Sequence, residues 1–252
     1  MSDNGQASVH CKTDGGICDL VMENPGRSNA LSKQLLADLA DQLENARETN
    51  ARVVILSGAG RKFSAGGDFN DLKGTIDDLA IDDAIEKVVD AIRGMPAPVI
   101  AAVEGPCMGG AVDIALACDL LVAGEGAFFE VPAARLGLLY NPRAVLRWRK
   151  RLSGLTLRSL LLAGERFAAD AAVAAGVVSH RVPTGSAAAR AQDLAAGILQ
   201  GTPAAVAATK DMLLAIESDE INLERWDELR REILASPERK AAVTKAKQSK
   251  PT

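Results

Sequence analysis

The first half of the chain alternates short, continuously apolar runs with segments of helical periodicity. Apolar residues run without a break over 53–56 and again over 99–103, as in strands that are covered on both faces. Leucines at helical spacing predict a helix over 31–47, and a second helix is predicted over 82–93 and ends at Gly94. This repetition of strand and helix predicts an α/β core of parallel strands.

The second half, from Arg143 onward, is rich in Ala and Leu and has helical periodicity that glycines interrupt. The predicted helices cover residues 155–163, 168–176, 186–199, 203–217 and 220–235. A strand-like segment, 177–182, contains His180. Ala-rich helices with few bulky side chains often pack against other subunits, so we expect a homo-oligomer.

Composition excludes several classes of function. With 2 His in the chain, a His-rich metal site cannot be built, and a His-dependent hydrolase has few bases to use. Aromatic residues total 3%, which is too few for the stacking platforms of single-stranded nucleic acid binding. The net charge is -4 and the pI is about 5.4. We therefore predict no metal and no nucleic-acid partner.

The sequence also bears on location. Residues 1–6 are polar and lack the features of a secretory signal, and the longest apolar stretch is far shorter than a membrane span. The 4 cysteines form no C-x-x-C pair, so we expect free thiols. These features predict a cytoplasmic protein with no membrane partner. His10 and His180 are expected to be structural.

Two glycine clusters each follow a predicted strand directly. They cover 64–68 and 105–110, and neither matches a dinucleotide fingerprint or a P-loop. Glycine allows close approach of the backbone, and a helix N-terminus presents unpaired N–H groups. Two such turns at the ends of neighbouring strands could direct two N–H donors at one oxygen, which is an oxyanion hole. The alternative is that both clusters are only tight turns.

In this order and spacing, the motifs resemble the crotonase (enoyl-CoA hydratase/isomerase) superfamily over nearly the whole chain. The matching segments are Asn24-Pro25, Asn29 to Leu31, 53–58, 63–68, 98–105, Gly109-Gly110, 117–119, Phe129 with Pro132, Leu136-Gly137, 163–165 and 175–178.

This resemblance implies a fold and a substrate class. The fold is a crotonase-like spiral of ββα units over 1–195, with a helical C-terminal extension over 196–252 for oligomerisation and pocket closure. Members are usually trimers or hexamers, and their ligand is an acyl-CoA thioester. Coenzyme A enters as part of the substrate, so no separate cofactor and no metal are expected.

The resemblance also assigns site residues. It places the oxyanion donors at the backbone N–H groups of Gly67 and Gly110. Substrate or CoA contacts are placed at Arg27, Ala30, Ala65, Asp68, Phe69, Ala133, Leu138 and Lys210.

The catalytic carboxylates depart from the usual pattern. Asp113 lies three residues after Gly110, on nearly the same helix face, where the family commonly has Glu; it is the predicted acid/base, and the alternative is a capping role. The second acid normally ends a Phe-x-x-Pro-Glu pattern, which here ends in Ala133. Alanine transfers no proton, so this departure weighs against hydration by two carboxylates. We interpret Glu130 as a solvated charge.

Tyr140 closes a Leu-Gly-x-x-Tyr segment that the family places along the acyl pocket. Its hydroxyl could bind a substrate carboxylate or water, and the alternative is a ring packed against the core. The basic residues between Arg143 and Arg151 are expected to solvate a helix, or to meet another subunit or the CoA phosphates.

Three hypotheses follow. The first is an acyl-CoA enzyme of the enoyl-CoA hydratase/isomerase type, with Gly67, Gly110, Asp113 and Tyr140 at its catalytic centre. The second is a methylmalonyl-CoA-type decarboxylase or an acyl-CoA hydrolase that uses the same oxyanion hole. The third is an acyl-CoA-binding protein without catalysis.

Overall fold

The apolar runs form the centre of a six-stranded sheet in the computed structural model, which describes residues 5–218 and 221–248. The strands in spatial order are β1 (Ser8–Asp14), β2 (Ile17–Glu23), β3 (Val53–Gly58), β4 (Val99–Val103), β6 (Leu120–Gly124) and β9 (His180–Val182). β1 pairs with β2 antiparallel, and every later pairing is parallel. The predicted parallel α/β core is confirmed.

A second, three-stranded sheet lies beside the first. It contains β5 (Pro106–Met108), β7 (Phe128–Glu130) and β8 (Phe167–Ala168) in that order. The chain leaves β4, turns at Gly105 and enters β5 directly, so one ββα unit contributes to both sheets. This arrangement is the spiral that the resemblance implies.

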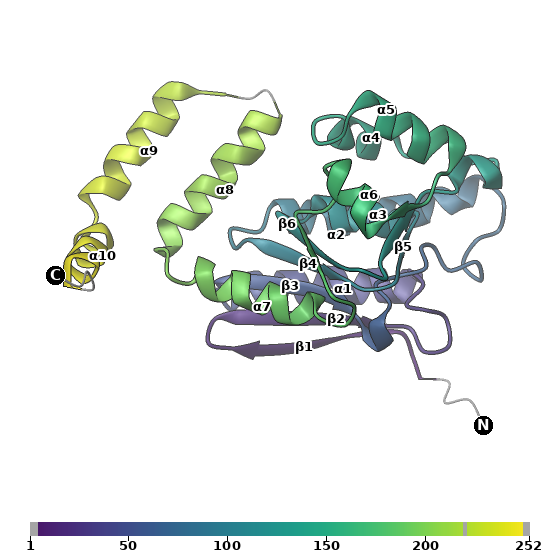
Figure 1. Cartoon of the computed structure of the whole chain (residues 1–252), viewed down its shortest axis with the longest axis horizontal. Coiled ribbons are helices and arrows are strands. Elements are labelled where there is room, and N and C mark those ends of the chain that lie inside the picture. Colours follow the sequence, from purple (N-terminus) through teal and green to yellow (C-terminus); the bar gives the residue numbers. More distant parts are fainter. Residues whose placement is uncertain (1–4, 219–220, 249–252) are drawn as a thin grey trace.

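Helices cover both faces of the large sheet (Figure 1). One face packs against α1 (Lys33–Glu48), α2 (Leu79–Arg93) and α3 (Gly110–Ala117), and the other against α7 (Ala187–Ile198). Side chains alternate along each strand: Leu56 and Ala101 lie in the first core, whereas Ile55 and Ile100 lie in the second. Burial on both faces explains why these strands are continuously apolar.

The last helix of the predicted core range, α7, packs on the large sheet. Ala187, Ala191 and Ala195 are buried against the strands, because their small side chains allow the helix to approach closely. All three lie within the predicted core of 1–195, and α7 continues three residues past that boundary to Ile198.

The other helices form two groups. The first group follows β7 and contains α4 (Pro142–Trp148), α5 (Gly154–Arg158) with a π-turn over Ser159–Ala163, and α6 (Ala169–Ala174). The second group contains α8 (Pro203–Glu217), α9 (Leu223–Ala235) and α10 (Pro237–Gln248). Short 3₁₀ turns cover Ala59–Arg61, Ile76–Asp78 and Ala133–Leu136.

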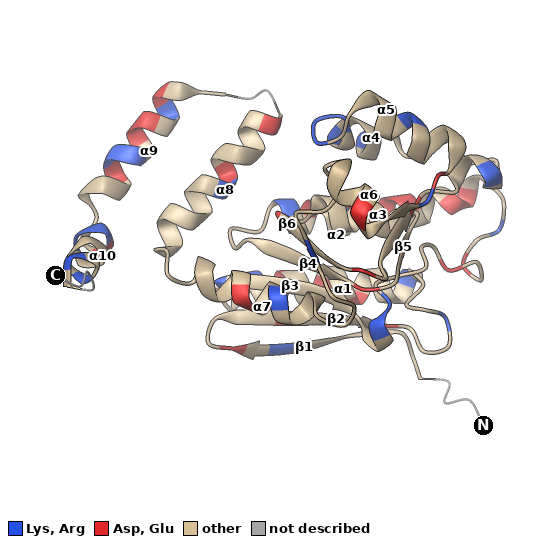
Figure 2. Cartoon of the chain, viewed as in Figure 1, with Lys and Arg blue, Asp and Glu red and all other residues tan. Residues whose placement is uncertain are grey.

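α8 to α10 extend away from the sheets as an arm (Figure 1). α9 carries charges of both signs along its length, whereas α8 is largely uncharged (Figure 2). Apolar side chains on the arm, such as Leu213 and Leu234, are exposed. The predicted helices over 203–217 and 220–235 are confirmed within the described residues, which omit 219 and 220.

Among the residues that the structure describes, no helix is long and apolar enough to cross a membrane. The cysteines are free thiols, as expected. Cys107 and Cys118 are buried, and burial raises the pKa of the Cys118 thiol to about 12.

Replacement of Leu39 by Ala tests the packing of α1 on the sheet. Leu39 is fully buried, so Leu39→Ala is expected to lower the free energy of unfolding by about 2–5 kcal/mol in urea titrations. Gln34→Ala on the exposed face of the same helix is the control, and its effect should stay within about 0.5 kcal/mol. Equal losses in the two variants would contradict this packing.

Candidate active site

The two glycine clusters lie side by side, at the carboxyl ends of β3 and β4. Ser64 and Cys107 form a parallel bridge, in which Ser64 N donates to Pro106 O at 2.9 Å and Met108 N donates to Ser64 O at 3.1 Å. Because β3 and β4 are parallel neighbours, the segments that leave them continue in contact. The prediction that these turns converge is confirmed.

Glycine is required where the two turns touch. Gly66 has a φ of +87°, and a Cβ at this position would lie 2.8 Å from Met108 O. Gly109 has a φ of +53°, and its N–H donates to Glu130 O at 2.8 Å. Side chains here would strain the backbone and push the turns apart.

The N–H groups of Gly67 and Gly110 have no acceptor among the described residues. Gly67 forms a parallel bridge with Leu31, in which Leu31 N donates to Gly66 O and Asp68 N donates to Leu31 O. The N–H of Gly67 therefore points away from Leu31. Gly110 is the first residue of α3, where N–H groups have no acceptor within the helix. A Cβ on Gly67 would meet nothing within 4 Å, so space is open beside it.

The loop before α1 is tied to the first turn by an ion pair. Arg27 Nη1 donates to the two carboxylate oxygens of Asp68 at 2.8 and 3.1 Å. Burial acts to raise the pKa of Asp68, but the N–H of Asn70 and the Arg27 guanidinium outweigh it, so this pKa is lowered. Asp68 is 7% exposed, so it anchors the loop more than it presents charge to solvent.

The other predicted CoA contacts in this region gather around the same turn. Ala65 N donates to Ser28 O at 3.0 Å, and Ala30 is buried beneath the loop. Phe69 is 70% exposed and is free to cover a ligand. The structure thus brings Arg27, Ala30, Ala65, Asp68 and Phe69 to one side of Gly67; their contact with CoA stays a prediction.

Asp113 is held in a buried charge cluster. It is 2% exposed; Arg147 Nη2 donates to Oδ2 and Trp148 Nε1 donates to Oδ1, both at 2.8 Å. Arg147 also forms a bidentate pair with Glu86, which is buried on α2. Asp113 thus binds two side chains of α4 rather than capping a loop, and its predicted acid/base role stays a prediction.

Two opposing effects act on the Asp113 carboxyl. Burial raises its pKa, while the Arg147 charge and the Trp148 N–H bond oppose this, and the net direction is upward. For the Arg147 guanidinium, burial acts to lower the pKa, but Glu86 and Asp113 raise it overall. The three groups therefore act as a single paired cluster.

Tyr140 joins this cluster to the glycine turns. Its O–H donates to Gly109 O at 3.1 Å, and its ring lies 5.0 Å from the Trp148 ring. Burial and then the charges of Asp113 and Asp82 hold the pKa of the Tyr140 hydroxyl well above its usual value. The ring packs against the core, as the alternative interpretation had it, and the hydroxyl supports the second turn.

The expectation for Glu130 is wrong, and the expectation for the basic run is wrong for two of its arginines. Glu130 is 5% exposed rather than solvated, because Arg135 and Arg166 both pair with it at 2.8 Å. Within the basic run, Arg147 faces inward to the cluster, and Arg151 donates to the backbone oxygens of Leu116 and Cys118. These arginines stabilise the chain internally and are not available to CoA phosphates.

The remaining predicted contacts differ in their accessibility. Ala133 is buried, and its carbonyl accepts from Leu138 N at 3.0 Å, while the Leu138 side chain is exposed. Lys210 is buried and donates to Ile92 O and Ala97 O at 3.0 and 3.1 Å, with Asp119 Oδ2 at 2.8 Å. An ammonium has three donors, so Lys210 anchors α8 and has no donor left for the predicted CoA contact.

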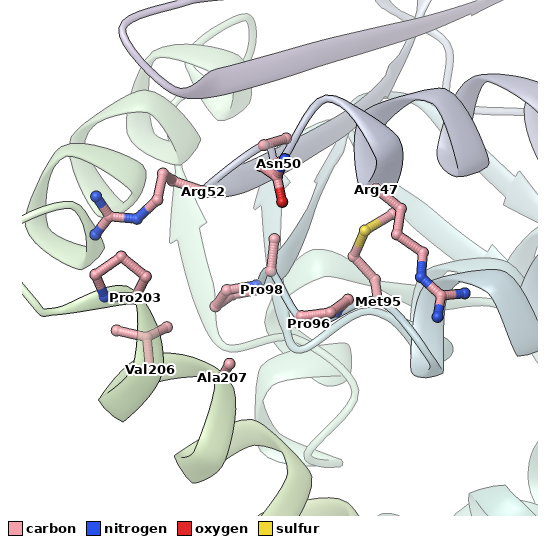
Figure 3. Close-up of a pocket in the computed structure, with 11 residues that line it drawn as sticks. Arg47, Asn50, Arg52, Met95, Pro96, Pro98, Pro203, Val206 and Ala207 are labelled. Carbon is pink, nitrogen blue, oxygen red and sulfur yellow. The ribbon is translucent and has the colours of Figure 1, made fainter. Parts of the chain in front are cut away.

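Two cavities lie away from the glycine turns. A cavity of about 240 Å³ is lined by Arg47, Arg52, Pro98, Val206 and other residues between α8 and the loops that enter β3 and β4 (Figure 3). A second, of about 380 Å³, adjoins it along α8. Both lie at the amino ends of the strands. No group of metal-ligating side chains was found within 5–218 and 221–248.

The chain belongs to the enoyl-CoA hydratase/isomerase family, whose model matches residues 12–249. It is 31% identical over 208 residues to the carnitinyl-CoA dehydratase of Escherichia coli K12, covering 81% of this chain and 79% of that protein. It is 31% identical over 199 residues, 78% of each chain, to a Mycobacterium tuberculosis protein described as a probable enoyl-CoA hydratase.

Solved structures agree on the fold. An enoyl-CoA hydratase/isomerase family protein from Hyphomonas neptunium superposes with a TM-score of 0.88 at 29% identity, covering 97% of this chain and 96% of that one. An enoyl-CoA hydratase from Polaromonas superposes with a TM-score of 0.79 at 27% identity, covering 89% of each. The crotonase fold is therefore shown, and the chain is similar to acyl-CoA enzymes.

Sequence reasoning missed Arg147 and Trp148 as partners of Asp113, and Glu86 as the second partner of Arg147. A signal was present for Glu86, which falls inside the buried apolar stripe of α2 beside Ile85 and Val89. A carboxylate in such a stripe requires a buried cation. Nothing local indicates which arginine supplies it.

Removal of the shared cation tests the cluster. Arg147→Met leaves two buried carboxylates unpaired, so it is expected to lower the free energy of unfolding by about 3–5 kcal/mol at neutral pH. The loss should shrink as pH falls, because the pKa of the buried Asp113 carboxyl is raised and its protonation removes an uncompensated charge.

Arg143→Met, on the exposed face of the same helix, is the control. Equilibrium unfolding in urea at several pH values measures both variants. A loss in Arg147→Met that does not change with pH would contradict the ion-pair explanation.

Proposed function

We propose that the chain acts on acyl-CoA thioesters as an enzyme of the enoyl-CoA hydratase/isomerase type, with the N–H groups of Gly67 and Gly110 as an oxyanion hole. The observation that carries this proposal is that two adjacent turns each leave an N–H group without an acceptor. Family membership and the carnitinyl-CoA dehydratase relative support the thioester substrate.

The physical basis is stabilisation of an enolate. When the α-carbon of a thioester loses a proton, negative charge develops on the carbonyl oxygen. Two fixed donors stabilise this charge more than the neutral carbonyl, and removal of one such donor typically costs about 2.7–4 kcal/mol. The positive end of the α3 dipole adds to this effect at Gly110.

The number of available carboxylates favours a reaction by proton transfer. The addition of water in the usual way needs two acids. Both oxygens of Asp113 already accept hydrogen bonds, and Ala133 replaces the second acid that the resemblance leads one to expect. Proton transfer at the α-carbon is common to isomerisation and hydration, and it needs one carboxylate. We therefore place the reaction at this carbon.

A decarboxylase is the second candidate. Loss of CO₂ from a malonyl-type thioester forms the same enolate without a base, which suits a site whose Asp113 is paired. Mass spectrometry of a panel of enoyl-, 3-hydroxyacyl- and malonyl-type CoA thioesters separates these functions. Turnover of enoyl substrates supports the first; turnover of malonyl substrates alone supports the second; saturable binding without turnover or α-proton exchange would overturn both.

Assembly is part of the same proposal. The exposed apolar side chains of α8 to α10 suit burial between subunits in a trimer or hexamer, as the resemblance implies. Light scattering of the purified chain tests this, and a monomer at micromolar concentration would contradict it. A cytoplasmic location stays a prediction.

Replacement of Gly67 by Pro removes its N–H donor. Gly67→Pro is expected to lower kcat by about 10²–10³-fold, because the enolate then has one donor. Gly67→Ala is the matched control: it keeps the N–H, and its Cβ meets open space, so it should retain most activity. Acyl-CoA binding and circular dichroism check that both variants fold, and equal kinetics in the two would contradict a donor role for Gly67.

A further inference from the structure

Asp82 is a carboxylate near the candidate site that has no neutralising partner. It lies in the first turn of α2, is half-buried, and has no hydrogen bond or ion pair among the described residues. The neighbouring carboxylates differ from it, since Arg147 pairs with both Glu86 and Asp113. Within the described ranges, Asp82 thus differs from Glu86 and Asp113 in having no cation beside it.

Asp82 lies on the face of α2 that contacts the start of α3. Residues three and four positions apart share a helix face, so Asp82 shares a face with Ile85 and Glu86. Ile85 packs directly on Gly110, where a Cβ would overlap its side chain. Glu86 accepts from Asn141 Nδ2 at 3.4 Å, next to Tyr140. This face of α2 thus covers Gly110 and the Tyr140 segment.

Electrostatics agree with this placement. The negative charge of Asp82 contributes to the raised pKa of the Tyr140 hydroxyl, which donates to Gly109 O. The pKa of Asp82 is itself raised, first by burial and then by the charges of Asp83 and Glu86. Carboxylates with raised pKa values are better proton acceptors and donors near neutral pH.

We propose that Asp82 is the catalytic acid/base that serves the enolate at Gly67 and Gly110. The inference rests on the proposed function. The Asp82 carboxylate removes a proton from the α-carbon of the thioester, and the C–H electron pair passes to the carbonyl oxygen as the enolate forms. The carboxylic acid then returns the proton to the chain, at the α-carbon in exchange or at the γ-carbon of a dienolate in isomerisation, so no other reactant is consumed.

Asp82→Asn tests this role against Asp83→Asn, which removes the exposed neighbouring carboxylate. α-Proton exchange of an acyl-CoA in D₂O, followed by mass spectrometry, reports the chemical step, and calorimetric titration reports binding. Asp82→Asn is expected to lower the exchange rate by about 10²–10⁴-fold with binding retained, and Asp83→Asn to leave it unchanged. Asp82→Glu, which keeps a carboxylate, should restore part of the rate.

The pH profile separates catalysis from support. In the wild type, kcat/KM falls as pH drops through the pKa of the base, which gives the pH profile an acidic limb. This acidic limb should be absent from the residual activity of Asp82→Asn. Full exchange in Asp82→Asn, or an unchanged limb, would overturn the role of Asp82 while leaving the oxyanion hole intact. A wild type without exchange or turnover on any thioester would instead overturn the proposed function, and the role of Asp82 with it.

Discussion

The close contact between two glycine turns is the constraint on which the site depends. β3 and β4 are parallel neighbours, and the segments that leave them stay paired through Ser64 and Cys107. Contact at Gly66 and Met108 leaves no room for side chains. The N–H groups of Gly67 and Gly110 thus belong to a rigid junction between two sheets, which is the kind of position where preorganised donors are effective.

The cluster of charged residues Glu86, Arg147 and Asp113 lies next to this junction and stabilises it. Three charges removed from water are costly, and mutual pairing offsets much of that cost. Trp148 and Tyr140 complete the cluster, and Tyr140 connects it to Gly109. Both carboxylate oxygens of Asp113 are engaged in this cluster. The proposed acid/base is instead Asp82, on the face of α2 that contacts Gly110.

The local parts of the fold were predictable, because they depend on periodicity. The runs at 53–56 and 99–103 became strands buried on both faces, and the glycine turns converged because their strands are parallel neighbours. Side-chain partners were not predictable from the chain alone. Glu130 and Arg147 look like surface charges in sequence, yet contacts across five and 61 residues make Glu130 buried and Arg147 half-buried.

The contacts of α7 show the same limit. The predicted core of 1–195 includes its alanines, but their pattern does not show that they pack on the face of the sheet opposite α1. Small side chains allow a helix to pack closely on any surface. The sequence does not show which surface that is. Lys210 was assigned to a ligand because of the resemblance, and its three donors serve the protein instead.

The most direct test of the central claim is the carbonyl stretching frequency of a bound thioester. An acyl-CoA with a ¹³C-labelled carbonyl, bound to the wild type, should show in isotope-edited infrared difference spectra a stretch below its value in water. Two fixed donors polarise the C=O bond more than water does. Gly67→Pro should move the frequency back toward the value in water. A bound thioester whose stretch matches that of free acyl-CoA in water would contradict the oxyanion hole.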